Sequence, residues 1–575
     1  MRDRCLAVVA SLALLPAGCA VPASPQADLV ILGGPVITLD PSLRRVEGVA
    51  VRDGRLVVVG SEAEVRAAAG PDTTVVDLGG RVLLPAFHDA HVHPVSAGVE
   101  LSQCNLNDLL TAEAVLEGVA RCVGEQRGRP WLVGGGFVLT AFPGGMPSLQ
   151  ALDRLTGGQP TALSSSDGHT LWVNTAALRV AGITRETPDP PAGRIERDGA
   201  GEPTGVLRES AAGLVGRHVP APTPAEYEAG LVRALAMMAR VGIVSFQEAN
   251  ADPAMVDTYR SLARDGRLTA RARLALGVDP TTGPDQVDGL VALRDGVVER
   301  GVVAGSAKLF LDGVLEAGTA ALLEPYVPLP GEHSTDAAGT ASGLATFTDA
   351  ALTTLVARLD GEGFQVHMHA IGDRAVRQGL DAVEAAVAAN GPRDRRHHLA
   401  HIQLVHPADL QRFASLGVVA NMQPLWAFAD AFITDLTEPR LGAQRSQHLY
   451  PFASLQRSGA RLAGGSDWSV TSVNPWHAIQ VAVTRRDLEA SADDPAWLPE
   501  ERLDLTTALQ AYTSGGAYVN FEDDVSGAIT VGRFADLIVV DRDPYAVAAH
   551  DLHRLQVLWT LKEGRETFRA ESFTP

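Results

Sequence analysis

The chain has 575 residues, of which 46% are hydrophobic, so it can bury a large core divided among more than one domain. It carries 68 Asp and Glu residues against 48 Lys and Arg residues, and its formal net charge is −20. Because this acidity repels phosphate backbones and anionic lipid headgroups, we expect no nucleic acid among its partners and no charge-driven binding to membranes.

The start of the chain indicates export. A basic beginning and the short apolar run 6–15 predict a signal peptide over residues 1–18, since the run is too short to span a bilayer. Cys19 follows in a stretch similar to a bacterial lipobox, which predicts a lipoprotein anchored in the cell envelope, with residues 19–27 as a tether. Cleavage by an ordinary signal peptidase near Ala20 is the alternative, and it would give a periplasmic or secreted soluble protein.

Both ends of the remaining chain are rich in β-forming residues. From Asp28 onward, short β-rich runs are separated by turn pairs such as Gly33-Gly34, a pattern typical of a small antiparallel sheet with hairpins. Runs of similar character return over 528–541 and 557–561. We therefore predict a composite β-sandwich, built from residues 28–84 at one end and residues 525–575 at the other.

The segment between these ends has an α/β pattern, in which apolar strand candidates alternate with Ala- and Leu-rich helical stretches. There are ten candidates, two more than a (β/α)₈ TIM-type barrel needs. We predict a barrel over residues 85–524, with an insertion at about residues 100–225 that takes the candidates near 131 and 161. The eight barrel candidates are 82–84, 242–246, 272–276, 307–311, 364–369, 398–401, 418–420 and 462–464.

Two cysteines, Cys104 and Cys122, lie outside the targeting segment. In an exported protein, a disulfide between them is a reasonable expectation. Two buried free thiols are the alternative. Neither cysteine has the spacing of a zinc ribbon.

Histidines gather where the predicted barrel strands end, and such ends form the active site of this kind of barrel. His91 and His93 follow the first candidate, and residues two apart in a strand point to the same face, so both imidazoles can reach one metal ion. Later strands contribute further polar side chains that converge on the same mouth. These are Lys308, His369, His401 and Asp467.

Five motifs, HDAHVHP, KLFLDG, HMHAIGDRAV, HLAHIQLV and GGSDWSV, occur in this order and resemble those of the amidohydrolase superfamily. With ADLIVVDRDP near the end and SDGHTLWVN in the insertion, the chain is most similar to amidohydrolase family 3, the N-substituted formamide deformylase-like branch. The resemblance covers about residues 28–565. It implies a metal-dependent hydrolase.

The resemblance also implies a ligand set. His91, His93 and Asp467 would hold one Zn²⁺, while His369 and His401 would hold a second. Lys308, carboxylated on its amine, would bridge the two ions. A mononuclear site, with Lys308 as an ion-paired structural residue, is the alternative, and Mn²⁺ or Fe²⁺ also suits such nitrogen and oxygen ligands.

These roles predict hydrolysis of a C–N bond in an amide, formamide or cyclic amide by a metal-activated hydroxide, with Asp467 passing the proton of the water to the leaving nitrogen. In the resembled family, the cluster of His169, Trp172 and Asn174 borders the pocket of the small-molecule substrate. The rival functions are a mononuclear deaminase or cyclic-imide hydrolase, and a lipid-anchored binding protein without turnover. The edge of the sandwich and the insertion are both candidate contact surfaces for a homodimer.

Overall fold

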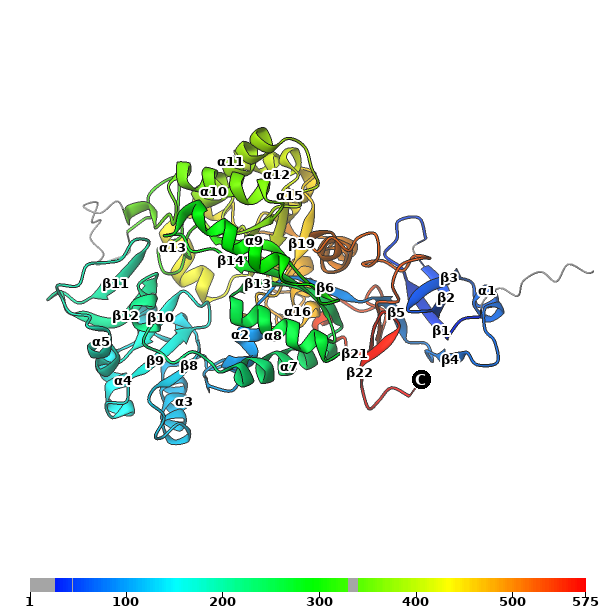
Figure 1. Ribbon diagram of the computed structural model, residues 1–575, viewed down its shortest axis with the longest axis horizontal. Coiled ribbons are helices and arrows are strands. Elements are labelled where there is room, and N and C mark those ends of the chain that lie inside the picture. Colours follow the sequence, from blue (N-terminus) through cyan, green and yellow to red (C-terminus); the bar gives the residue numbers. More distant parts are fainter. Residues whose placement is uncertain (1–25, 44, 329–339, 575) are drawn as a thin grey trace, which may run out of the picture.

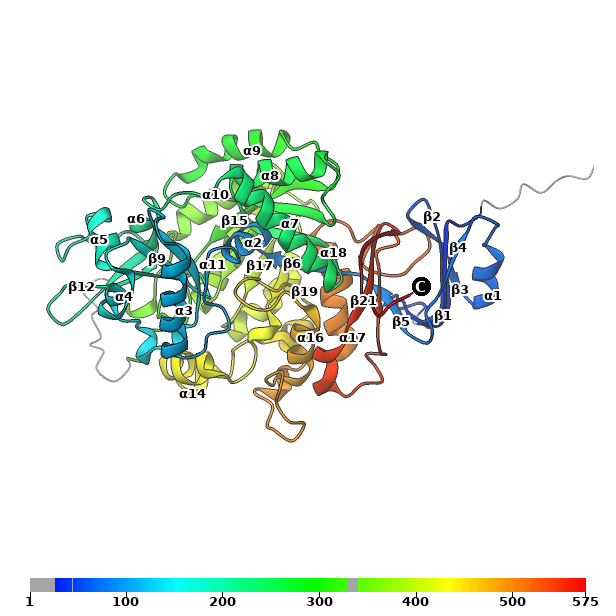
Figure 2. The same cartoon turned by 90° about the horizontal axis from the view of Figure 1, so that it is seen from below.

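The computed structural model describes residues 26–43, 45–328 and 340–574 (Figure 1). The predicted signal peptide, Cys19 and most of the tether lie outside these residues. Figures 1 and 2 show an inserted domain and a terminal sheet at opposite ends of a central barrel. Within the described part of the chain, no helix is long and apolar enough to cross a membrane.

The central domain is an eight-stranded barrel whose neighbouring strands are all parallel, which confirms the predicted fold class. In spatial order the strands follow the chain. They are β6 (Phe87–Val92), β13 (Ile243–Ala251), β14 (Arg271–Gly277), β15 (Val302–Phe310), β16 (Gln365–Ala370), β17 (His398–His401), β18 (Val419–Met422) and β19 (Leu462–Gly464).

Helices follow most of these strands along the chain. The helix before β13 begins where the sequence provides a complete N-terminal cap, because Thr223 and Glu226 form a capping box and Pro224 occupies the first turn. The helices of the barrel are α7 (Pro224–Arg240), α8 (Pro253–Arg264), α9 (Val287–Asp295), α10 (Asp349–Gly361), α11 (Asp373–Asn390), α12 (Leu410–Leu416), α15 (Phe452–Arg457), α16 (Pro475–Thr484) and α17 (Leu505–Gln510).

Both ends of the described chain meet in one eight-stranded sheet, which encloses its own apolar core. In spatial order, β22-β21-β20-β5-β1-β2-β3 form the sheet, and β4 pairs with β1. The strands are β1 (Leu29–Ile37), β2 (Arg45–Arg52), β3 (Arg55–Gly60), β4 (Thr74–Asp77), β5 (Val82–Pro85), β20 (Leu537–Val540), β21 (Val557–Lys562) and β22 (Arg565–Arg569).

Three details of this region correct the sequence predictions. The sheet is mixed, because β4 and β5 pair with β1 in parallel. Gly33-Gly34 is no hairpin turn: it lies inside β1, where the register with β2 shifts and Gly33 has a φ of 82°. The run 82–84 belongs to β5 of this sheet, paired with β20, and the first barrel strand begins only at Phe87.

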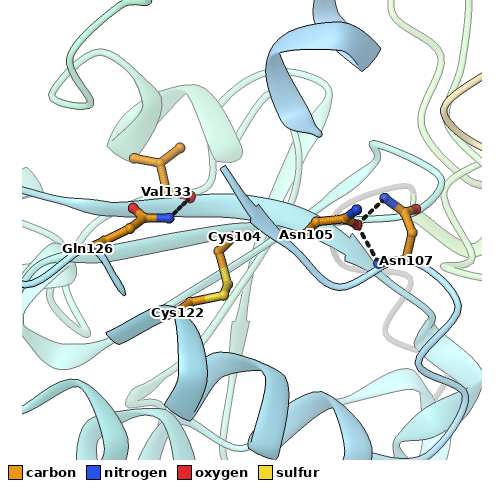
Figure 3. The surroundings of a disulfide bond; sticks show 6 residues. All are labelled: Cys104, Asn105, Asn107, Cys122, Gln126 and Val133. Atoms are coloured by element: carbon orange, nitrogen blue, oxygen red, sulfur yellow. Dashed lines mark hydrogen bonds between the residues drawn. A yellow bond between two sulfur atoms is a disulfide. The ribbon is translucent and has the colours of Figure 1, made fainter. Parts of the chain in front are cut away.

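The inserted domain lies between β6 and β13 and has a six-stranded mixed sheet in the order β11-β12-β10-β9-β8-β7. A disulfide joins Cys104 to Cys122, and it ties the first strand of the domain to its first long helix (Figure 3). The elements are β7 (Cys104–Asn105), α3 (Ala112–Glu125), β8 (Leu132–Phe137), α4 (Leu149–Thr156), β9 (Thr161–Ser165), β10 (Thr170–Val173), α5 (Thr175–Ala181), β11 (Gly193–Arg197), β12 (Pro203–Glu209) and α6 (Ala212–Gly216).

Arg271 joins the barrel to the C-terminal part of the chain. It begins β14 and is buried, and its guanidinium lies 2.6 Å from the carboxylate of Asp536 and 3.0 Å from that of Glu522. Asp536 is itself buried. Loss of the guanidinium would therefore leave a buried carboxylate without its partner.

We predict that Arg271→Ala lowers the free energy of unfolding by about 3–5 kcal/mol, the usual cost of leaving one partner of a buried ion pair alone. Urea unfolding followed by circular dichroism should show this as a lower urea concentration at the midpoint of the first transition. The control is Arg45→Ala, which removes a pair with Asp543 whose arginine side chain is 47% exposed, and it should cost at most about 1 kcal/mol. Equal shifts for the two variants would contradict the prediction.

Candidate metal centre

The six side chains predicted as metal ligands all lie at the C-terminal mouth of the barrel. His91 lies in β6 and His93 follows this strand, whereas Asp467 follows β19. The other three come from neighbouring strands: Lys308 from β15, His369 from β16 and His401 from β17. All are buried except His93, whose side chain is 23% exposed.

The mouth is organised by the seam between the first and last barrel strands. The backbone N–H of Asp467 donates to the carbonyl of His91 at 2.8 Å, and the N–H of His93 donates to the carbonyl of Trp468 at 3.0 Å. The buried carboxylate of Asp89 accepts the N–H of His91 at 3.1 Å and that of Ser466 at 3.0 Å. These four hydrogen bonds fix the position of Asp467 relative to both histidines.

His91, His93 and Asp467 form a compact group of possible ligands. The Nε2 atoms of the two imidazoles each lie 3.2 Å from Oδ1 of Asp467. Ligand atoms placed tetrahedrally at the usual zinc distances are about 3.3 Å apart. The spacing therefore suits a divalent ion bound by these three side chains.

His369 and His401 lie beside this group. Nδ1 of His401 is 3.9 Å from Oδ2 of Asp467, and the rings of the two histidines are 4.5 Å apart. Nε2 of His369 donates to the carbonyl of Gly313 at 3.1 Å, which leaves Nδ1 with a free lone pair. Burial lowers the pKa of both imidazoles well below the usual value, so both are neutral, as metal binding requires.

Several buried atoms at the mouth have no hydrogen-bond partner among the described residues. They are Nζ of Lys308, Nδ1 of His401 and Oδ1 of Asp467. Buried polar groups are normally satisfied, and a bound cation would satisfy the imidazole and the carboxylate. Lys308 makes no salt bridge within the described part of the chain, and burial lowers the pKa of its amine to about 7. The donor set therefore fits a metal centre.

The side chains around His91, His93 and Asp467 shift the pKa values of all three residues. Burial, followed by the charge of Lys308, lowers the pKa of His91 to about 3. Burial also lowers the pKa of His93, but Asp467 and Glu248 outweigh this effect and raise it to about 9. Burial would raise the pKa of Asp467, yet the neighbouring histidines hold it well below its usual range. Asp467 is therefore an anion, and a metal ion would displace the proton of His93.

The backbone at two of these residues is strained. His401 has a φ of 74° and Asp467 a φ of 51°, both in the left-handed region that residues other than glycine seldom adopt. Each such residue costs on the order of 1–3 kcal/mol and persists only when the surrounding structure holds it. The hydrogen bond from the His401 N–H to the Gln423 side chain, at 2.9 Å, and the seam supply this support.

Two further side chains support the ligands from behind, in the way that outer partners commonly orient metal-binding histidines. Nε2 of His367 lies 2.9 Å from Nδ1 of His91, and Oε1 of Glu248 lies 3.6 Å from Nδ1 of His93. Tyr259 in turn donates its hydroxyl to Glu248 at 2.9 Å. Glu248 was not among the predicted site residues, although a carboxylate two residues after the apolar run 242–246 was a usable signal.

A cavity of about 590 Å³ opens beside the candidate metal centre. His369, His401 and Asp467 line it, together with His169 from the inserted domain. The ring of Trp426 stacks on His401, with an interplanar angle of 6°. His169 is paired with Glu209, at 2.7 Å, and its ring lies 5.0 Å from that of His369. The inserted domain thus contributes directly to the pocket.

Trp172 and Asn174 do not line this cavity, which corrects their prediction as substrate-binding residues. Trp172 is fully buried in the core of the inserted domain, where it packs against Phe137 and Phe142. Asn174 is fully buried as well, and its side-chain oxygen caps α5 by accepting the N–H of Ala177 at 2.9 Å. Both side chains therefore serve the fold.

Comparisons with known proteins agree with this geometry. A sequence model of the amidohydrolase family matches residues 74–568. Protein LONG AFTER FAR-RED 3 of Arabidopsis thaliana is 32% identical over 556 residues, which cover 95% of this chain and 92% of that protein. N-substituted formamide deformylase of Arthrobacter pascens is 28% identical, covering 93% of this chain and 97% of that protein. An uncharacterized metal-dependent hydrolase from Pyrococcus furiosus superposes with a TM-score of 0.66 at 25% identity, covering 90% of this chain and 99% of that chain.

We predict that Asp467→Asn abolishes tight zinc binding, because the neutral amide removes the anion that faces both His91 and His93. Zinc per chain, measured by elemental analysis after chelation, reloading and desalting, should fall by at least the one ion held by this group. The control, Asp381→Asn, changes a carboxylate that is 58% exposed on α11 and should keep the wild-type zinc content. An unchanged zinc content in Asp467→Asn would rule out this ligand group.

Proposed function

The chain belongs to the amidohydrolase family, and we propose that it is a metal-dependent hydrolase that cleaves the C–N bond of a small non-peptide amide. The observation that carries the proposal is the convergence of His91, His93 and Asp467, with 3.2 Å between each imidazole and the carboxylate. The relative named N-substituted formamide deformylase aligns over nearly the whole of both chains and favours formamides within this substrate class.

In this proposal His91, His93 and Asp467 would hold one Zn²⁺, and His369 and His401 would hold a second. When bound, such ions lower the pKa of water and polarise a carbonyl oxygen, which supplies a nucleophile and stabilises developing negative charge. The solved structure from Pyrococcus furiosus is named a metal-dependent hydrolase, which supports the need for a metal. Mixed imidazole and carboxylate donors suit zinc well, although they also accept other divalent ions.

Lys308, as a carbamate formed on its amine, would be the ligand shared by the two ions. Its Nζ has no polar partner among the described residues and lies 4.7 Å from the centre of the Phe310 ring. An ion-paired structural lysine would have a carboxylate in contact, and Lys308 has none within 4 Å in the described part of the chain. Carbamate formation requires a neutral amine, and burial favours the neutral form of Lys308.

Asp467 moves the proton in this mechanism. Its carboxylate is anionic and points into the cavity, so it can accept a proton from the attacking water and deliver it to the nitrogen that leaves. Trp426 and Trp468 line the same cavity with apolar surface and exclude bulk water from the reacting atoms. In this mechanism Asp467 transfers the proton, and the two tryptophans form the apolar lining.

The predicted location and partners belong to the same proposal. A lipid anchor on Cys19 would place the barrel in the cell envelope, where small-molecule amides reach it by diffusion. The disulfide between Cys104 and Cys122 agrees with an oxidising compartment. Radiolabelled palmitate incorporated into the wild type and not into Cys19→Ser would support the anchor. A homodimer would be detected by light scattering of the purified protein.

We predict that purified, zinc-loaded protein hydrolyses N-benzylformamide to benzylamine and formate, measured by release of the primary amine. Chelation should abolish turnover, and added Zn²⁺ should restore it. Asp467→Asn should lose about 10²–10⁴-fold in kcat/KM, the usual contribution of a positioned proton-transfer group, with any loss of metal adding to this. If a broad panel of amides and formamides leaves the wild type as inert as Asp467→Asn, the non-catalytic binding function is favoured.

We predict that Lys308→Ala lowers the zinc content from two ions per chain to one, because the bridging ligand is lost while the group of His91, His93 and Asp467 stays intact. Native mass spectrometry of the wild type should also show the mass of one added CO₂, absent from the variant. One zinc ion per chain in both proteins, and no CO₂ adduct, would favour the mononuclear deaminase or cyclic-imide hydrolase.

A further inference from the structure

The charged side chains that line the cavity are mainly negative. Apart from the candidate metal centre and His169, its charged side chains are all carboxylates, and no Lys or Arg is among the described residues that line it. Aromatic side chains form much of the remaining wall, including Trp426, Phe428, Tyr450 and Trp468. The carboxylates are Glu100, Asp108, Asp167, Glu316, Asp430 and Asp487. Such a lining repels anions and attracts cations.

Two of these carboxylates, Glu316 and Asp430, line the cavity and form no salt bridge within the described part of the chain. Oε1 of Glu316 accepts a hydrogen bond from the side chain of Gln403 at 3.3 Å, and Oδ1 of Asp430 accepts the N–H of Ile433 at 3.0 Å. Burial, followed by repulsion from Asp167 and Asp430, raises the pKa of Glu316 to about 7. Burial likewise raises the pKa of Asp430 to about 6. Each carboxylate thus lines the cavity without a positive partner among the described residues.

The hydroxyl of Tyr450 also lacks a partner among the described residues. Tyr450 is only 2% exposed and lines the cavity, yet no residue in the described ranges forms a hydrogen bond with its hydroxyl. Burial, and then the charges of Glu316 and Asp430, raise the pKa of this phenol well above its usual value. Gln403 links Tyr450 to Glu316, because its carbonyl accepts the N–H of Tyr450 at 2.7 Å and its side chain donates to Glu316 at 3.3 Å. The hydroxyl oxygen of a cavity-lining tyrosine can accept a hydrogen bond from a bound donor.

We propose that this region binds the ammonium group of an amine-bearing amide, which pairs with Glu316 and Asp430 and donates a hydrogen bond to the hydroxyl of Tyr450. This substrate class rests on the proposed hydrolase function. An organic ammonium fits better than a bare metal ion because the cavity has the volume of a small-molecule site and aromatic walls that attract cations. The amide end of the substrate then lies toward His369, His401 and Asp467, which line the same cavity.

The test uses the zinc-loaded full chain and a matched pair of substrates. One is N-benzylformamide with an aminomethyl group in the para position, and the other carries an uncharged ethyl group of similar size there. We expect kcat/KM for the cationic compound to exceed that for the neutral compound by at least 10-fold at low ionic strength. Glu316→Gln and Asp430→Asn should each reduce this ratio at least 5-fold, whereas Glu117→Gln, on the exposed face of α3, should keep it.

Two results would overturn the proposal: a neutral compound that is hydrolysed as well as the cationic one, or a ratio that stays unchanged in both carboxylate variants. The ratio remains informative if one variant folds poorly, because the other variant tests the same region. Circular dichroism identifies such a variant before the assay.

A binding experiment separates this proposal from the hydrolase function. If the wild type hydrolyses neither compound, calorimetry with benzylammonium and with benzyl alcohol still tests the region. Binding of benzylammonium at least 10-fold tighter than benzyl alcohol, with this preference lost in Glu316→Gln, would support the cation site even though the hydrolase proposal had failed. Equal binding of both probes by the wild type would contradict the cation site itself.

Discussion

The structure depends on the contact between the first and last strands of the barrel. The hydrogen bonds that join His91 to Asp467 and His93 to Trp468 close the seam and bring together residues more than 370 positions apart in the chain. Because these bonds are between backbone atoms, the relative position of the three proposed ligands is set by strand pairing and not by flexible side chains. The left-handed backbone of Asp467, with a φ of 51°, shows that the seam holds a geometry the chain would not adopt alone.

The other parts of the molecule surround this seam. The terminal sheet holds the base of the barrel, where Arg271 reaches the buried Asp536. The inserted domain covers the mouth and adds His169 to the cavity, so one body shapes the pocket while another stabilises the barrel. Burial at the mouth keeps His369 and His401 neutral and Lys308 close to neutrality, the protonation states that metal binding and carbamate formation require.

Sequence patterns predicted this arrangement where local periodicity was strong. The barrel strands at 398–401 and 462–464 have the predicted bounds. In the first, two apolar residues lie between two histidines, and the second is a short apolar run that ends at Gly464. Patterns failed where tertiary pairing decides the outcome. The run 82–84 was predicted as the first barrel strand, but it pairs with the distant β20, and no local signal encodes that choice. Trp172 and Asn174 were predicted at the pocket because the cluster borders it in the resembled family. Neighbours in sequence need not share a face in space, and only His169 of that cluster reaches the cavity.

Whether the mouth of the barrel is a metal centre can be measured by anomalous diffraction at the zinc absorption edge from crystals of the zinc-loaded protein. We expect a strong peak at about 2.0–2.2 Å from Nε2 of His91, Nε2 of His93 and a carboxylate oxygen of Asp467. A second peak near His369 and His401, with density extending from Nζ of Lys308, would complete the binuclear centre. A map with no peak at the seam, or with zinc bound elsewhere, would show that His91, His93 and Asp467 are not the metal ligands.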